Sequence, residues 1–308
     1  MSKENFLQFY RDAFLDKDLR DEFKAVTSMA ETVKLGQRGG YNFSAADARA
    51  AMIAYGEEIA AVVRSARAQP AVKSAANTIV GYNYDFNIDE ITGFDAIARE
   101  AAELKIKPTS VNLAAFDQLF KKEDLHSTEL SPASAEFATI NDDITTSLQT
   151  MPKPSGEAGY SQRDIHLINL DLNVEHPEYD AYFQRKVRMV RLLSEFFDAD
   201  VKFSGGLWYP PNSYRLWHTN ETQPGWRMYI VDYDKAPRED RAFFRFMNPK
   251  TKELVTLNER PRLVRFFRIA SRAEGLFWHC IVNASASHRW SFGFVVPETW
   301  QSRLLQRS

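Results

Sequence analysis

The sequence predicts an α+β fold in which a helical N-terminal domain precedes an antiparallel jelly roll of two β-sheets. Three observations support this prediction: helical periodicity up to about residue 125, one long amphipathic stretch at 178–197, and eight short strand-like runs from residue 200 onward. Short strands at close intervals, separated by turn residues, are typical of double-sheet β architectures. The long amphipathic stretch predicts a helix that covers one face of a sheet.

The N-terminal region is predicted to be helical. Aromatic and aliphatic side chains recur there at three- and four-residue steps among charged residues, which predicts two short amphipathic helices before residue 24. Ser44 stands before an alanine-rich run with Asp47 three residues later, an N-cap pattern that opens a helix through about Arg67. Further helices are expected at about 94–106 and 111–122.

Residues 126–163 are rich in Ser, Thr, Pro and Gly and are predicted to form a linker or long loop. The chain therefore divides into a helical domain (1–64), a helical connector with linker (65–163) and a β domain (164–308). Within the last, Ile165 to Leu172 alternates like a strand. The eight later strands are expected at 200–209, 213–218, 226–233, 242–247, 253–257, 262–269, 276–283 and 289–296.

The composition is that of an ordinary globular chain. Of 308 residues, 44% are hydrophobic and 26% are charged, which excludes a disordered or fibrous protein. The 39 basic residues nearly balance 41 acidic ones, so the chain lacks the overall positive charge that would attract it to a nucleic acid or an anionic membrane. We expect neither a signal peptide nor a membrane span. The single cysteine, Cys280, excludes an internal disulfide and favours a cytoplasmic location.

The candidate site combines histidines with an arginine, a serine and a tyrosine. His218 and His279 lie at predicted strand ends, and two imidazoles with open positions suit a non-heme Fe(II) centre. Arg289 and Ser291 share one face of a predicted strand, where a guanidinium and a hydroxyl can bind a carboxylate. If that carboxylate belongs to a small dicarboxylate, the phenol of Tyr209 can bind the same molecule from a neighbouring strand.

The segment from about residue 165 to about residue 300 resembles the Fe(II)- and 2-oxoglutarate-dependent oxygenases. The resemblance lies in the order and spacing of Tyr209, His218, Asn220, His279, Arg289 and Ser291. The resemblance implies a double-stranded β-helix, which is a cupin-like jelly roll. It also implies that His218 and His279 ligate iron, and that the 2-oxoglutarate cosubstrate is held by Arg289, Ser291 and Tyr209. The expected enzyme is a dioxygenase that hydroxylates a peptide or an amino acid.

Asn220 departs from the pattern of this family, which has an acidic ligand two residues after the first histidine. An amide oxygen is a poorer ligand than a carboxylate, so Asn220, water or the neighbouring Glu221 could complete the iron site. Halogenating relatives carry a small residue here, and the bulkier Asn220 favours hydroxylation over halogenation. The alternative function is a non-catalytic module that binds a peptide or a partner and has lost a full iron site.

The start of the chain resembles the Nif-eleven-type leader domains of ribosomally made, modified peptides. The residues that carry this resemblance are MSKENFLQFYRDAFLDKDLRDEF and the turn Gly39 to Ser44, within residues 1 to about 55. It implies a role in modified-peptide biosynthesis, in which the domain docks a peptide or a biosynthetic protein partner, or takes part in self-modification. The alternative is a helical cap that packs on the β domain and seals its edge.

The segment from Arg227 to Arg272 carries twelve basic residues against six acidic ones. The interpretation that we favour is a solvated outer sheet face carrying Arg262, Arg265 and Arg268. If several of these residues instead lined the mouth of the site, they would favour an anionic substrate such as an acidic peptide. Phenylalanines interleave with the basic residues, but the chain carries no nucleic-acid motif, and we expect no nucleic-acid partner.

Overall fold

The computed structural model of the chain describes residues 29–48, 78–80, 83–150, 161–171, 176–177, 179–238, 241–270 and 275–305, with single positions and residue pairs between 5 and 26. The chain forms two compact units, Met1–Gln69 and Pro70–Ser308. The helix predicted after Ser44 is seen for residues 45–48, and its remainder lies outside the described residues.

The N-terminal unit has a small aromatic core. Helix α3 (Met29–Arg38) contributes Leu35, which packs with Phe6, Phe9 and Phe43. The predicted capping pattern is present, because the Ser44 hydroxyl accepts from the backbone N–H of Asp47 at 3.1 Å while the Asp47 carboxylate accepts from the Ser44 N–H at 2.8 Å. The reciprocal bonds satisfy backbone donors at the start of the helix.

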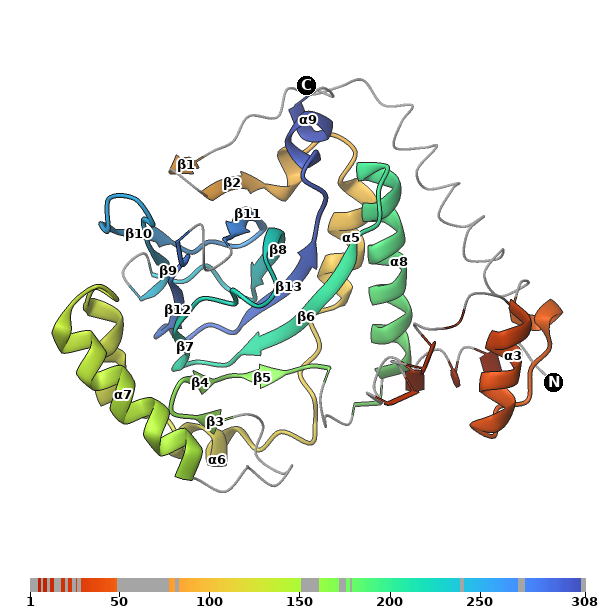
Figure 1. The fold of residues 1–308 in the computed structure, drawn as a ribbon, viewed down its shortest axis with the longest axis horizontal. Coiled ribbons are helices and arrows are strands. Elements are labelled where there is room, and N and C mark those ends of the chain that lie inside the picture. Colours follow the sequence, from red (N-terminus) through yellow and green to blue (C-terminus); the bar gives the residue numbers. More distant parts are fainter. Residues whose placement is uncertain are drawn as a thin grey trace. The chain divides into compact units, whose positions relative to one another are not determined.

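The second unit is built on two antiparallel sheets (Figure 1). The seven-stranded sheet has the order β1-β2-β11-β8-β13-β6-β5, and the six-stranded sheet has the order β10-β9-β12-β7-β4-β3. The shorter early strands are β1 (Thr78–Val80), β2 (Asn83–Asn87), β3 (Ser161–Gln162), β4 (Ile165–His166) and β5 (Ile168–Asn169). The later ones are β6 (Lys202–Tyr209), β7 (Ser213–His218), β8 (Gly225–Tyr233), β9 (Ala242–Met247), β10 (Leu254–Asn258), β11 (Leu263–Ile269), β12 (His279–Asn283) and β13 (Arg289–Val295).

The eight later strands match the eight predicted ones in order, with ends that differ by at most three residues. Strands β6, β8, β11 and β13 lie in one sheet, and β7, β9, β10 and β12 lie in the other, so the chain passes repeatedly between the sheets. A mixed fold of helices and antiparallel sheets is thereby established. The strand order is consistent with the predicted jelly roll.

Helices cover the outer face of each sheet. Helices α5 (Asp95–Glu103) and α8 (Tyr179–Phe197) pack together beside β6 (Figure 1), and α9 (Trp300–Leu305) packs on β11 through Trp300, whose ring stacks on Phe266 at 4.0 Å. The long helix α8 lies where the amphipathic stretch predicts it. Lys186 is 1% exposed and donates to Asp171 at 2.6 Å, while the same carboxylate accepts from the Gly206 N–H at 2.8 Å, which ties α8 to β6.

Residues 126–163 are more structured than the predicted linker. They contain the second half of the 3₁₀ helix η2 (Lys122–Glu129), helix α7 (Ala135–Thr150) and strand β3, which follow helix α6 (Leu113–Gln118). Ser134 caps α7 through a 3.1 Å bond from the Phe137 N–H, and Ile144 packs on Leu216 of β7. The Ser- and Thr-rich composition conceals this helix because its apolar residues are few, although they recur at helical spacing.

The connector predicted at 65–163 also contributes to the seven-stranded sheet. β2 pairs antiparallel with β11, with Asp85 opposite Arg265, and a short 3₁₀ helix, η1 (Ile88–Glu90), follows it. The second compact unit therefore begins near Pro70 rather than at residue 164. In the part of the chain that the structure describes, no helix has the length and apolar character needed to cross a membrane.

Candidate functional site

One cavity of about 40 Å³ lies between the two sheets and brings the predicted site residues together. Its lining includes all six of them: Tyr209, His218, Asn220, His279, Arg289 and Ser291. They come from β6, β7, the turn after β7, β12 and β13. The sequence spacing therefore predicted a true spatial cluster, although the role of each residue remains a prediction.

The two histidines face each other across a strand pair. His279 opens β12 and lies opposite His218, the last residue of β7, in antiparallel register. Their ring centroids are 4.0 Å apart with an interplanar angle of 52°. His279 is buried, and His218 is partly exposed.

Hydrogen bonds orient both imidazoles. Nδ1 of His218 lies 2.8 Å from the Leu216 carbonyl oxygen, and Nδ1 of His279 lies 3.1 Å from the Phe277 carbonyl oxygen. A carbonyl only accepts, so each Nδ1 carries the proton and each Nε2 presents a lone pair. Burial lowers the pKa of His279 to about 3, and burial together with the Arg215 charge lowers that of His218 well below its usual value. Both rings are thus in the neutral form that binds metals.

A β-bulge in β7 shapes the site next to His218. His279 pairs with His218 and Ile281 pairs with Arg215, so three steps along β7 match two along β12. In a regular strand, Arg215 and His218 would point to opposite faces. The extra residue lets both side chains line the cavity, while Leu216 and Trp217 pack on the outer side against α7 residues.

Arg289 and Ser291 project into the cavity from β13, as predicted for residues two apart on a strand. Tyr209 lies directly opposite Arg289 in register, and the guanidinium carbon of Arg289 lies 4.6 Å from the centre of the Tyr209 ring. Arg289, Ser291 and Tyr209 are each at most 2% exposed. Nη1 of Arg289 is buried and has no hydrogen-bond partner among the residues described. A buried donor of this kind is suited to an anionic ligand.

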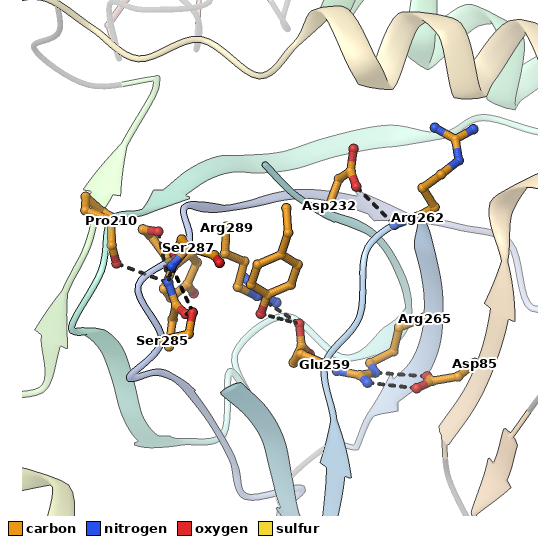
Figure 2. Close-up of polar contacts among 12 residues, drawn as sticks. Asp85, Pro210, Asp232, Glu259, Arg262, Arg265, Ser285, Ser287 and Arg289 are labelled. Carbon is orange, nitrogen blue, oxygen red and sulfur yellow. Dashed lines mark hydrogen bonds and ion pairs between the residues drawn. The ribbon is translucent and has the colours of Figure 1, made fainter. Parts of the chain in front are cut away.

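A carboxylate that sequence reasoning missed holds Arg289. Figure 2 shows Glu259 between Arg289 and Arg265, with Asp85 on the far side of Arg265. Nε of Arg289 donates to Glu259 at 2.9 Å, and Arg265 donates from Nη1 to the other Glu259 oxygen and from Nε and Nη2 to Asp85 at 2.9 and 2.7 Å. Burial alone would raise the pKa of Glu259, but the charges of Arg289 and Arg265 outweigh it and lower the pKa.

The basic stretch divides between the two faces of its sheet. Arg265 points inward, is 1% exposed and lines the cavity. Arg262 pairs with Asp89 outside the cavity, and Arg268 lies 3.9 Å from Glu298. The favoured interpretation of a solvated outer face is therefore wrong for Arg265, because the period-two alternation of β11 directs it inward with Phe267.

Asn220 and Glu221 differ in position. Asn220 lines the cavity from a turn with a left-handed φ of 53°, and its carbonyl accepts from the Gln223 N–H at 3.0 Å. Asparagine tolerates that conformation better than most residues. The Glu221 carboxylate accepts from the Thr219 hydroxyl, and Glu221 is not among the residues lining the cavity.

Sequence reasoning also missed the cavity's third arginine, Arg215. Tyr229, Phe244 and Phe267 line the cavity together with Arg215, and the rings of Tyr229 and Phe267 stack at 5.4 Å. Phe267 and Phe244 lie 5.2 and 5.8 Å from the His279 ring. The alternation of inward and outward residues in β8, β9 and β11 predicts that these aromatic side chains point inward. The inward direction of Arg215 could not be predicted in this way, because it depends on the bulge in β7.

The donor set fits a metal ion held by two imidazoles with its other positions open. Because Nδ1 of each ring is bonded to a carbonyl, Nε2 of His218 and Nε2 of His279 are the nitrogens left to bind a metal, and Asn220 lines the same cavity. Among the described residues there is no group of three or more His, Cys, Asp and Glu side chains arranged for a metal. Any third protein ligand from this cavity lining would therefore be neutral.

Comparison with known proteins identifies the start of the chain. Residues 1–47 match the Nif11 domain. This confirms the resemblance noted for the N-terminal region, and the aromatic core and capped helix described above belong to the Nif11 domain and the residues that follow it. Among curated proteins, none matches the chain.

Several solved structures are similar to the chain. A Pseudomonas putida prolyl-4-hydroxylase shares 13% identity, covering 78% of this chain and 99% of its own, at a TM-score of 0.31. EvdO2 from Micromonospora carbonacea var. aurantiaca, complexed with 2-oxoglutarate, shares 12% identity. The match covers 73% of this chain and 94% of the EvdO2 chain, at a TM-score of 0.33. An oxidoreductase of the 2OG-Fe(II) oxygenase family from Burkholderia pseudomallei shares 13% identity. The match covers 62% of this chain and 94% of that oxidoreductase, at a TM-score of 0.31. Because these TM-scores are low, the function proposed next rests on the site geometry.

Proposed function

We propose that the protein is an Fe(II)- and 2-oxoglutarate-dependent oxygenase built on a double-stranded β-helix, and that it hydroxylates its substrate. The single observation that carries this proposal is the pair of opposed histidines, His218 and His279, which line one cavity together with Arg289, whose Nη1 is buried without a partner among the described residues. A metal site and a carboxylate site in one cavity suit a cosubstrate that binds both.

In this proposal, His218 and His279 hold the iron and Asn220 or water occupies a further position. Arg289 pairs with the distal carboxylate of 2-oxoglutarate, and the hydroxyls of Ser291 and Tyr209 donate to it. Glu259 keeps the guanidinium of Arg289 in place by fixing Nε, so that Nη1 stays directed at the ligand. Bound iron and 2-oxoglutarate would supply the oxidising chemistry. The aromatic wall of Phe244 and Phe267 excludes water from the histidine end.

The substrate class that we propose is a peptide or an amino acid. The Nif11 domain supports this choice, because leader domains of this type are recognition elements in modified-peptide biosynthesis. We propose that it docks either the peptide or a biosynthetic protein partner. The cytoplasmic location stays a prediction from the single cysteine.

The rival function is a binding module without catalysis, and one observation favours it. Among the described residues that line the cavity there is no carboxylate, since Asn220 occupies the place of the expected acid and Glu221 bonds to Thr219. Under this proposal the cavity would bind an anion through Arg289 without holding iron.

Anaerobic spectroscopy separates the two functions. We expect Fe(II) and 2-oxoglutarate together, but neither alone, to give a visible metal-to-ligand charge-transfer band. His279→Ala should abolish the band, and His126→Ala, at an exposed position in η2, should leave it intact. Arg289→Ala should weaken the band by raising the 2-oxoglutarate concentration required, because a charged hydrogen bond is lost. No band in the wild type, together with no succinate from any candidate substrate, would contradict the oxygenase.

A further inference from the structure

Arg215 is a partly buried cation that the proposed chemistry does not use. It lines the cavity with His218 and His279, and its Nε is buried without a hydrogen-bond partner. Within the described part of the chain, its side chain makes neither a salt bridge nor a hydrogen bond. Its charge nevertheless acts at the histidine end, where it contributes to the lowered pKa values of both imidazoles.

The other two arginines of the cavity are neutralised by protein carboxylates. Arg265 has Asp85 and Glu259, and Arg289 shares Glu259 (Figure 2). The acidic residue that acts on Arg215 is Asp164, just before β4. Burial raises the pKa of Asp164, the Arg215 charge opposes that rise, and no salt bridge joins the two side chains. Arg215 is therefore the one cavity arginine, among those described, without a protein counter-ion in contact.

A guanidinium that lines a cavity, has a buried Nε without a partner and lacks a counter-ion is expected to acquire one when the site is filled. In the proposed function, the distal carboxylate of 2-oxoglutarate faces Arg289 and its other carboxylate goes to the metal. That assignment leaves Arg215 for a different anion. The bulge in β7 is what brings this guanidinium to the histidine end, beside the position where a substrate would be oxidised.

We infer that Arg215 binds a carboxylate of the prime substrate and that this substrate is an acidic peptide, with an Asp or Glu side chain next to the oxidised position. This inference rests on the proposed function. A guanidinium presents two parallel donors that match a carboxylate and discriminate it from an amide. The bulge in β7 sets the position of the Arg215 guanidinium relative to His218. Arg215 therefore determines which substrate residue lies next to the histidines as well as how tightly the substrate binds.

The test uses four blocked tripeptides, acetyl-Ala-X-Ala-amide, in which X is Asp, Asn, Glu or Gln. Each is titrated calorimetrically into the full chain loaded with Mn(II) and 2-oxoglutarate. We expect at least one acidic peptide to bind about tenfold or more tightly than its amide partner. Arg215→Gln should abolish this preference, and Arg215→Lys should retain part of it, because lysine keeps the charge and loses the fork.

Arg268→Gln is the matched control, because Arg268 lies outside the cavity on β11 and its loss should leave the preference unchanged. Equal or absent binding of all four peptides by the wild type, or a preference that survives in Arg215→Gln, would overturn the inference. The loading of 2-oxoglutarate is measured first in every protein. If it fails in the wild type, the proposed function is contradicted and the inference falls with it; if loading succeeds without any acidic preference, only the inference fails.

Discussion

Arg289 donates from Nε to Glu259 at 2.9 Å, and the remaining Nη1 of the same guanidinium is buried in the cavity without a hydrogen-bond partner among the described residues. The protein thus fixes Nε of the arginine and leaves Nη1 able to bind an anion. Preorganised donors of this kind bind an anion without paying to reorganise at the moment of binding. Glu259 is accordingly as important to the site as the arginine it holds.

Glu259→Gln should destabilise the protein and weaken its binding of 2-oxoglutarate. The substitution keeps the shape of the side chain and removes the charge shared by Arg289 and Arg265, which costs about 3–5 kcal/mol when a buried pair is broken. We expect a lower Tm, and a smaller rise in Tm on adding 2-oxoglutarate than in the wild type, because Arg289 loses the carboxylate that holds it. Glu253→Gln, at an exposed position before β10, is the control. An unchanged Tm would show that Glu259 contributes no net stabilisation.

Asn220→Asp should strengthen metal binding. Aspartate tolerates the left-handed φ of 53° and places a carboxylate where the amide lines the cavity. We expect Fe(II) affinity to rise about tenfold or more, as measured by anaerobic titration. Glu221→Gln should leave the affinity unchanged, because Glu221 bonds to Thr219. If Asn220→Asp bound iron as the wild type does, residue 220 would not reach the metal.

His166 should make stability depend on pH. Its ring stacks on Phe116 with centroids 3.9 Å apart, and burial lowers its pKa to about 4, which a charge at Asp117 only partly opposes. The unfolded chain, with a pKa near 6.5, binds a proton that the folded state rejects, so stability is lost as pH falls from about 6.5 toward 4.

His166→Phe should remove this loss. Between pH 7 and pH 5 we expect the wild type to lose about 2 kcal/mol more than the variant in urea denaturation. His126→Phe, at an exposed position, should follow the wild type. Parallel pH profiles for His166→Phe and the wild type would mean that the folded state accommodates the charged ring.

Gly36→Ala should destabilise the N-terminal unit and leave the stability of the second unit unchanged. A Cβ at this position would overlap the ring of Phe43, which is fully buried in the aromatic core. Overpacking of this kind costs about 1–3 kcal/mol. We expect hydrogen exchange of residues 29–48 to accelerate roughly tenfold or more, with the amides of β12 and β13 unaffected. Gln37→Ala, at an exposed position of α3, is the control, and equal exchange in the two variants would contradict the packing argument.

Much of the β domain could be predicted from local pattern. The eight later strands alternate, and they are bounded by turn residues such as Asn248 and Pro249, so their limits are visible in the sequence. Helix α7 was missed because its Ser and Thr residues resemble a loop. The partnership of β2 with β11 was missed because nothing local specifies which distant strand a segment will join.

The sequence by itself determined which residues are candidates for the chemistry, because Arg289 and Ser291 share one strand face by a period of two and His218 and His279 lie at predicted strand ends. Only the tertiary structure decided how they are supported. The bulge that turns Arg215 inward is a property of two paired strands, and Glu259 meets Arg289 and Arg265 across thirty and six residues of chain. Such contacts depend on which strands become neighbours, and that is settled by packing of the whole unit.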